Sequence, residues 1–190
     1  MLHPAPLRDL LMRGAAADVM QARWSDAVLG EMVRSLARRR PDVGVAGFNR
    51  LRTAMERALP DARVDGYESL MRDLALPDPD DRHVLAAAVH AGAAVIVTFN
   101  LADFPAAALA PYGVAAQHPD AFVGHCLDVA PQTMRRLVSE QAGALRRPPL
   151  SVDAVLDALA ALGLERSTSR LRALLAADPL RKGLPPTPAP

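Results

Sequence analysis

Apolar and polar residues follow two different periods over residues 1–120. In residues 5–19, 25–40 and 45–59 the apolar positions recur three or four residues apart, as in amphipathic helices. Ser25 is positioned to cap the second of these helices, and Pro41 ends it. Residues 94–98 (AVIVT) and 113–116 (GVAA) are instead apolar at consecutive positions, which is typical of strands buried on both faces of a parallel sheet.

Residues 62–92, between the first helices and the apolar strands, indicate how helices and strands alternate along the chain. A third short strand is predicted at 62–64, followed by a helical turn. Asp80 and Asp81 precede a helix that runs through Ala91, and Gly92 follows as the residue that ends it. Helices that alternate with short strands predict an α/β domain over residues 1–120, with helices flanking a parallel sheet in three layers.

After residue 120 the pattern is helical throughout. Its apolar stretches are separated by Pro131, Pro148–Pro149 and Gly163, and Ser151 is positioned to cap one of the helices. We therefore predict a helical extension over residues 121–178. The Pro-rich residues 179–190 predict a disordered tail.

Composition excludes several classes of protein. The net charge is +1, which argues against bulk electrostatic coating of nucleic acid but leaves room for a local basic patch. Cys126 is the only cysteine, so there is no disulfide framework and no multi-cysteine zinc site, and we expect it to be a buried apolar residue. His83 and His90 lack the i, i+4 spacing of paired metal ligands, so the histidines do not suggest a site. No apolar run reaches the roughly 18 residues of a membrane span, and no secretory signal is apparent, so we expect a cytoplasmic location without membrane attachment.

The acids at the junctions of helices and strands have two interpretations. Asp78, Asp80 and Asp81 could cap a helix, Asp103 could cap a turn, and Glu31 could be a solvated residue on the flank of its helix. However, Asp103 follows the carboxyl end of a predicted strand and Asp81 opens the helix that leads into it, and functional groups gather at the carboxyl ends of parallel strands. Gathered carboxylates with few histidines favour Mg²⁺ or Mn²⁺. Both interpretations remain open from the residues alone.

A cluster of arginines ends the helix that carries Glu31. The cluster could complement the helix dipole or contact phosphates. Arg38 stands seven residues after Glu31, two turns along on nearly the same face. The cluster comprises Arg34, Arg38, Arg39 and Arg40.

One stretch resembles a known family. DDRHVLAAAVHAGAAVIVTFNLADF resembles the C-terminal half of PIN-domain ribonucleases, most of all the VapC-type toxins of bacterial toxin–antitoxin pairs. The family pattern is an Asp that opens a helix, a Gly that ends it, a hydrophobic strand and then T-x-N-x-x-D-F. RWSDAVLGEMVRSL resembles the family's second helix, with Glu31 at the position of its acid, and the likeness covers roughly residues 1–118. The residues that match the first pattern are Asp81, Ala88, Gly92, Thr98, Asn100, Asp103 and Phe104.

The resemblance implies an endoribonuclease that depends on Mg²⁺ or Mn²⁺. Asp81 and Asp103 would be metal ligands, with Glu31 bound directly or through water. Thr98, Asn100 and Asp80 would support them, with Asp80 as the alternative to Asp81. RNA would be contacted by Arg34, Arg38 and Arg39. The resemblance also implies a cognate antitoxin as partner, dimerisation, and a helical tail like that of a subgroup with an extended C-terminus.

In one respect the chain departs from the family. The family's first acid is an Asp on the first strand, shortly before the segment that LHPAPLRDLL resembles, and no acid precedes Leu2 here. Two explanations are open. In the first, the start of the frame is placed too late, and Met1 stands where the family carries Val. In the second, the product is truncated and lacks both a core strand and a metal ligand. In the second case we expect a module that binds antitoxin or RNA without cleaving it.

Overall fold

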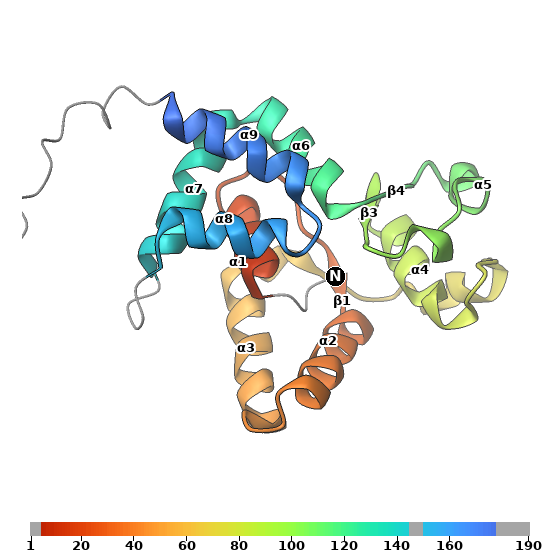
Figure 1. Ribbon diagram of the computed structural model, residues 1–190. Helices are drawn as coiled ribbons and strands as arrows, with labels where there is room; N and C mark the ends of the chain where they lie inside the picture. The colour runs from red at the N-terminus through yellow and green to blue at the C-terminus, as the bar shows by residue number, and fades with distance from the viewer. Residues whose placement is uncertain (1–4, 145–149, 178–190) are drawn as a thin grey trace, which may run out of the picture.

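The computed structural model describes residues 5–144 and 150–177, in which short parallel strands are set among helices (Figure 1). This confirms the predicted α/β class with C-terminal helices, while the tail predicted at 179–190 lies outside the described residues. The helices are α1 (Ala5–Ala16), α2 (Asp26–Arg39), α3 (Gly44–Ala58), α4 (Arg82–His90), α5 (Ala106–Leu109), α6 (Pro119–Val129), α7 (Pro131–Ala144), α8 (Val152–Ala160) and α9 (Glu165–Ala176). The strands are β1 (Trp24–Ser25), β2 (Arg63–Val64), β3 (Val95–Val97) and β4 (Ala115–Gln117). Short 3₁₀ turns occur at η1 (Pro60–Ala62), η2 (Glu68–Asp73), η3 (Pro79–Asp81), η4 (Leu101–Asp103) and η5 (Ala110–Tyr112).

The described strands form two parallel two-stranded sheets rather than one larger sheet. β1 pairs with β2, with Ser25 opposite Val64, and β3 pairs with β4, with Ile96 opposite Ala116. The three predicted strands are found within one or two residues, whereas β1 was not predicted. The expectation that residues 94–98 are buried on both faces is wrong, because only Ile96 is buried. Among the described strands β3 is bonded only to β4, and its residues also line a cleft.

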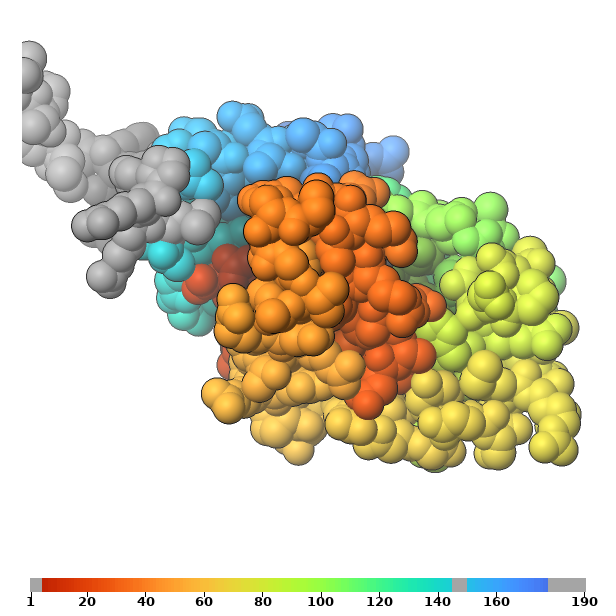
Figure 2. All heavy atoms as spheres, turned by 90° about the horizontal axis from the view of Figure 1, so that it is seen from below, coloured from red at the N-terminus to blue at the C-terminus, as the bar shows by residue number. Residues whose placement is uncertain are grey.

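Three groups of buried side chains hold the chain together. The first joins α1 to α6–α9, the second joins α4 to β3 and β4, and the third joins α2, α3 and β1. Leu7 and Leu10 of α1 are fully buried in the first group, so the helical extension shares its core with the N-terminal helix. Figure 2 shows the surface of α2 and α3 in orange beside the yellow and green residues that follow them. Cys126 is buried as expected, and burial raises the pKa of its thiol to about 11.

Local signals in the sequence fix the ends of the two helices nearest the cleft. Ser25 Oγ accepts a hydrogen bond from the backbone N–H of Val28 at 3.3 Å, so the predicted cap of α2 is confirmed. Gly92 has φ 62°, and its N–H donates to the carbonyl of Val89 at 3.2 Å. A residue without Cβ is favoured at this left-handed position, which ends α4 and turns the chain toward β3.

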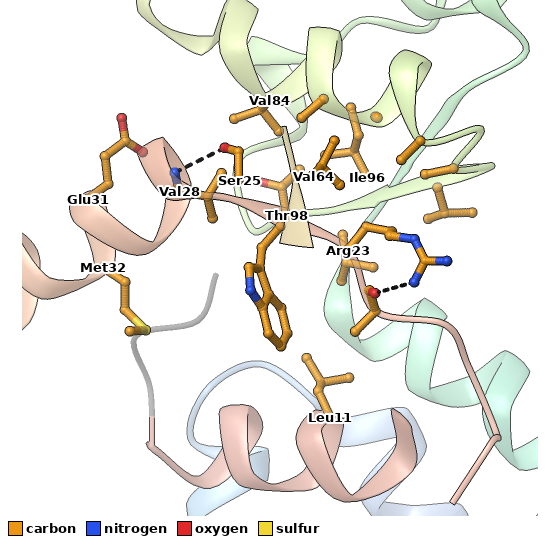
Figure 3. Close-up of a pocket in the computed structure, with 18 of the residues that line it drawn as sticks. Leu11, Arg23, Ser25, Val28, Glu31, Met32, Val64, Val84, Ile96 and Thr98 are labelled. Carbon is orange, nitrogen blue, oxygen red and sulfur yellow. Dashed lines mark hydrogen bonds between the residues drawn. The ribbon is translucent and has the colours of Figure 1, made fainter. Parts of the chain in front are cut away.

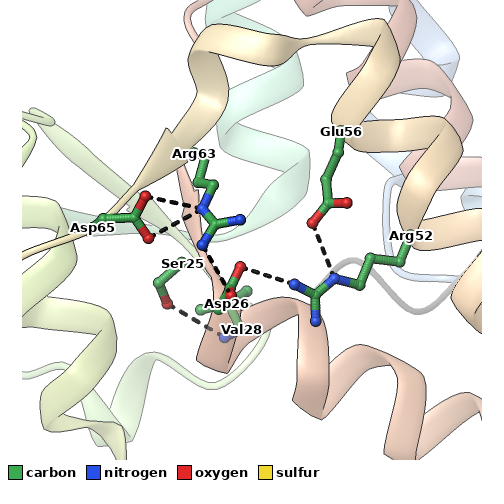
Figure 4. A network of polar contacts seen from close by, with 7 residues as sticks. All are labelled: Ser25, Asp26, Val28, Arg52, Glu56, Arg63 and Asp65. Carbon is green, nitrogen blue, oxygen red and sulfur yellow. Dashed lines mark hydrogen bonds and ion pairs between the residues drawn. The ribbon is translucent and has the colours of Figure 1, made fainter.

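An ion-pair network around Asp26 orients the start of α2 (Figure 4). The Asp26 carboxylate accepts from Arg52 of α3 at 2.8 Å and from Arg63 of β2 at 3.2 Å. Arg52 also pairs with Glu56 at 3.0 Å, and Arg63 pairs with Asp65 at 2.9 Å. Pairs this exposed contribute about 1 kcal/mol or less each, so their main effect is orientation. They join the N-terminus of α2 to α3 and β2, and so help to position the rest of α2.

Candidate active site

A cleft of about 990 Å³ is lined by residues of both sheets and of helix α1. Its lining includes Ser25 of β1, Val64 of β2, Ile96 of β3 and Leu11 of α1, together with Thr98 just beyond the carboxyl end of β3. Figure 3 shows Val64 and Ile96 across the cleft from Leu11. Charged side chains also line it: Arg23 directly before β1, Glu31, Arg34 and Arg38 of α2, and Asp81 directly before α4.

Two of the acids named in the sequence, Glu31 and Asp103, act electrostatically on the third, Asp81. Burial raises the pKa of the Asp81 carboxyl above its usual value, and the negative charges of Asp103, Asp78 and Glu31 raise it further. A like charge raises the pKa of a carboxyl appreciably only over a short distance. Glu31 on α2 and Asp103 on η4 are therefore close enough to Asp81 on η3 for their charges to act on it, although within the described residues no three such side chains are grouped so as to hold an ion.

The turn after β3 fixes Asp103. The backbone N–H of Asn100 donates to Thr98 Oγ1 at 3.1 Å, and the side-chain amide of Asn100 donates to Asp103 Oδ2. Thr98 lines the cleft, whereas Asn100 and Asp103 do not belong to its lining. The two residues predicted to support the site are therefore linked, because Thr98 orients Asn100 and Asn100 orients the Asp103 carboxylate.

Only one of the three acids in residues 78–81 makes a capping hydrogen bond. Asp78 Oδ1 accepts from the backbone N–H of Asp80 at 2.8 Å and caps η3. Of the possible caps, Asp80 does not cap the helix, because a 3₁₀ turn intervenes and its cap, Asp78, lies two residues earlier. Asp81 stands at the N-cap position of α4 without a capping hydrogen bond from its side chain. Capping thus explains Asp78 and leaves the Asp81 carboxylate for the cleft.

The predicted RNA-binding arginines separate into two groups. Arg34 and Arg38 line the cleft, and in the part of the chain that the structure describes neither has an ion-pair partner. Arg39 is exposed and does not line the cleft. Arg40 is paired with Asp42 at 2.7 Å, so its charge is already matched.

His83 enters this region although the sequence suggested no histidine site. Its side chain is 9% exposed, and its Nε2 lies 3.1 Å from Glu31 Oε1. The sequence offered one indication that His83 lies near the site, its position two residues after Asp81. That signal says nothing of Glu31, which is 52 residues away in the chain.

The donor chemistry suits a hard divalent cation held partly by water. Glu31, Asp81 and Asp103 offer carboxylate oxygens, the ligands that Mg²⁺ and Mn²⁺ favour. Over residues 5–144 and 150–177, however, no three His, Cys, Asp or Glu side chains are grouped so as to hold an ion. Mg²⁺ commonly keeps several waters and takes one or two protein carboxylates. These residues therefore fit a hydrated ion and do not form a closed protein cage.

Comparison with known proteins identifies the class. A family model described as PIN domain matches residues 1–102, more than half of the chain, and the chain belongs to this family. A second family model, described as VapC50 C-terminal domain, matches residues 119–173 and so covers α6–α8 and most of α9. The resemblance to PIN-domain proteins of the VapC type is thereby confirmed, together with its C-terminal extension.

A particular relative is found in Mycobacterium tuberculosis (strain ATCC 25618 / H37Rv). It is described as "Putative ribonuclease VapC50" and is 46% identical over 79 residues, which are 42% of this chain and 47% of that protein. The chain thus spans about half the length of the relative it matches. No solved structure matches the chain. Within the described ranges, no helix is both long enough and apolar enough to cross a membrane.

Proposed function

We propose that the chain is an endoribonuclease that uses Mg²⁺ or Mn²⁺ to hydrolyse RNA phosphodiester bonds. The observation that carries the proposal is that the acids Glu31 and Asp81 line one cleft together with Arg34 and Arg38. The raised pKa of Asp81, which reflects burial and the charges of Asp103, Asp78 and Glu31, agrees with it. Carboxylates gathered from separate elements repel one another, and a bound cation would relieve that repulsion. The relative described as a ribonuclease supports the same reaction class.

In this proposal each side chain of the site has a distinct role. Asp81 and Asp103 bind the cation, and Glu31 binds it directly or through a water. A divalent cation there would lower the pKa of a bound water and stabilise negative charge on the phosphate. Asn100 holds the Asp103 carboxylate through its amide, and Thr98 holds Asn100. Asp80 is exposed and is not among the charges that raise the pKa of Asp81, so we assign it no role in this proposal.

Arg34 and Arg38 would bind the phosphates of the RNA. Both line the cleft beside Glu31, and their charges are unmatched within the described residues. Contacts to phosphate position a nucleic acid without reading its sequence. Arg39, outside the cleft lining, would contribute only to the longer-range attraction of RNA.

We further propose that this ribonuclease is the toxin of a type II toxin–antitoxin pair in the cytoplasm, with a cognate antitoxin as inhibitor and a homodimer as its assembled form. The match of residues 119–173 to the VapC50 C-terminal domain supports this. Residues 1–120 would form the nuclease domain and residues 121–178 the extension. Because α1 packs into the core of the extension, the two parts should unfold together.

A second candidate is a PIN module that binds antitoxin or RNA without cleaving it. It is favoured by one observation, that no three candidate ligands are grouped to hold an ion in the described residues. The two candidates differ in whether the chain as it stands cleaves RNA when Mg²⁺ or Mn²⁺ is added.

The experiment compares the full chain with Asp81→Asn and Asp103→Asn, with Asp80→Asn as the matched control. RNA cleavage is followed with a labelled transcript, and Mn²⁺ binding by isothermal titration calorimetry. Loss of a ligand should lower Mn²⁺ affinity and cleavage by more than about 10-fold, the lower limit for outer-shell partners, while the control behaves as the parent. Unchanged Mn²⁺ affinity in both ligand variants would defeat the metal site. Metal binding without cleavage would select the second candidate.

A further inference from the structure

We infer that His83 is a positioning residue that holds Glu31 in the site, by donating its Nε2–H to Glu31 Oε1. This inference rests on the proposed function and adds a residue to it. The two atoms lie 3.1 Å apart and join the first turn of α4 to the middle of α2. His83 follows Asp81 by two residues, so one short segment carries both a proposed ligand and the group that orients another.

Glu31 needs such a partner. Its side chain is 50% exposed. A Glu side chain loses much of its rotamer freedom when it is fixed in place. In the described part of the chain, His83 is its one hydrogen-bond partner. Without that bond, little else fixes the direction of the carboxylate.

His83 is itself held firmly, and its surroundings favour one tautomer. The imidazole is packed at the base of α4, and its Nδ1 is buried without a hydrogen-bond partner in the described residues. With the proton on Nδ1, a buried N–H would lack an acceptor, and the Nε2 lone pair would face the Glu31 carboxylate. With the proton on Nε2, the ring donates to Glu31 and leaves only a lone pair unsatisfied.

This arrangement distinguishes a positioning residue from a metal ligand. Nε2 is occupied by Glu31, and the lone pair of Nδ1 is buried on the other side of the ring. The imidazole therefore offers no lone pair to a cation in the cleft. It sets the place of Glu31 relative to Asp81 through a rigid ring, in the way that outer-shell groups orient the side chains that bind metals.

The test replaces the donor and then restores it. His83→Leu removes the donor, whereas His83→Gln keeps an amide N–H close to the position of Nε2. His90→Leu, an exposed histidine on the same helix, is the matched control. We expect Mn²⁺ affinity, measured by calorimetry, to fall about 10-fold or more in His83→Leu, to recover largely in His83→Gln and to stay at the parent level in the control. RNA cleavage should follow the same order.

A double-mutant cycle tests whether His83 acts through Glu31. If it does, His83→Leu adds no further loss of Mn²⁺ affinity in the Glu31→Ala background. An equal loss in both backgrounds, or parent affinity in a folded His83→Leu, would overturn the inference. If His83→Leu does not fold, His83→Gln is compared with His83→Asn, whose amide is too short to reach the Nε2 position. Equal Mn²⁺ affinities of these two variants would also overturn it.

Failure of the proposed function would look different. A parent chain that neither binds Mn²⁺ nor cleaves RNA contradicts the nuclease proposal. The hydrogen bond is then judged by urea unfolding, in which the midpoint shifts of His83→Leu and Glu31→Ala should be non-additive. Additive shifts would show that the two side chains are not coupled. They would overturn the inference about His83 independently of the nuclease proposal.

Discussion

Removing the two cleft arginines should change how RNA binding depends on salt. Arg34 and Arg38 line the cleft beside Glu31 and have no ion-pair partner within the described residues. Each phosphate contact to a single strand contributes about 0.7 to the slope of log affinity against log salt concentration, so the variant Arg34→Gln/Arg38→Gln should lose about 1.4 from that slope. Between roughly 50 and 200 mM salt, the parent should then lose about sevenfold more affinity than the variant.

The assay is fluorescence anisotropy of a labelled single-stranded RNA across a series of NaCl concentrations. EDTA is present so that binding is measured without metal-dependent cleavage. Arg40→Gln is the matched control, because it removes the same charge from the same end of α2 but from an arginine paired with Asp42 at 2.7 Å. Its slope should equal that of the parent.

Two results would refute this reasoning. A double variant with the parent's slope would mean that the cleft arginines do not contact phosphate. A control whose slope falls as far per charge as that of the double variant would mean that the effect is a general loss of positive charge. Either result would contradict the proposal that these two arginines bind RNA phosphates.

Three further perturbations test the surrounding structure. In metal-free buffer the ionised Asp81 carboxylate is disfavoured in the folded chain, so the stability of the parent relative to Asp81→Asn should rise as the pH falls through the raised pKa of Asp81. Urea midpoints of both proteins at several pH values measure this. A difference between them that does not change with pH contradicts it. Leu85→Ala, at a fully buried position in α4, should lower the free energy of unfolding by about 2–5 kcal/mol in urea titrations. Asp120→Ala removes the carboxylate that accepts from the backbone N–H groups of Ser167 at 2.8 Å and Arg166 at 3.2 Å. It should cost about 0.5–2 kcal/mol, as loss of a helix cap does, and an unchanged urea midpoint would show that this contact does not stabilise α9.

Local signals made most helices predictable, whereas the arrangement of the strands was not. Ser25 and Gly92 act on hydrogen bonds within a few residues, so a cap and a helix end can be predicted without tertiary structure. The strand at Trp24–Ser25 is only two residues long and exists because it pairs with Arg63–Val64. No period can appear in two residues, and the division of the described strands into two sheets depends on such distant pairings.

The site shows the same limit. The order of helix, strand and turn predicts that Asp81 and Asp103 approach one another at one end of β3, and the charge of Asp103 does act on Asp81. Their role as metal ligands stays a prediction. The sequence could not decide which of Asp78, Asp80 and Asp81 caps, because the intervening 3₁₀ turn places the cap at Asp78, two residues before Asp80. His83 was missed because its partner lies on another helix, and spacing along one helix cannot reveal a contact between two.

The separation of capping from binding leads to a final prediction. Asp78 makes the capping hydrogen bond, so the Asp81 carboxylate is not used as a cap. Because that carboxylate is partly buried among like charges, its ionised form is unfavourable in the folded chain. A cation bound beside it removes that penalty and competes with the proton for the same oxygens. Mn²⁺ at about 100 times its dissociation constant should therefore stabilise the parent by about 2.7 kcal/mol, and by less as pH falls toward the raised pKa. Urea unfolding across a Mn²⁺ series measures this. Equal stabilisation of the parent and Asp81→Asn would show that the cation binds elsewhere.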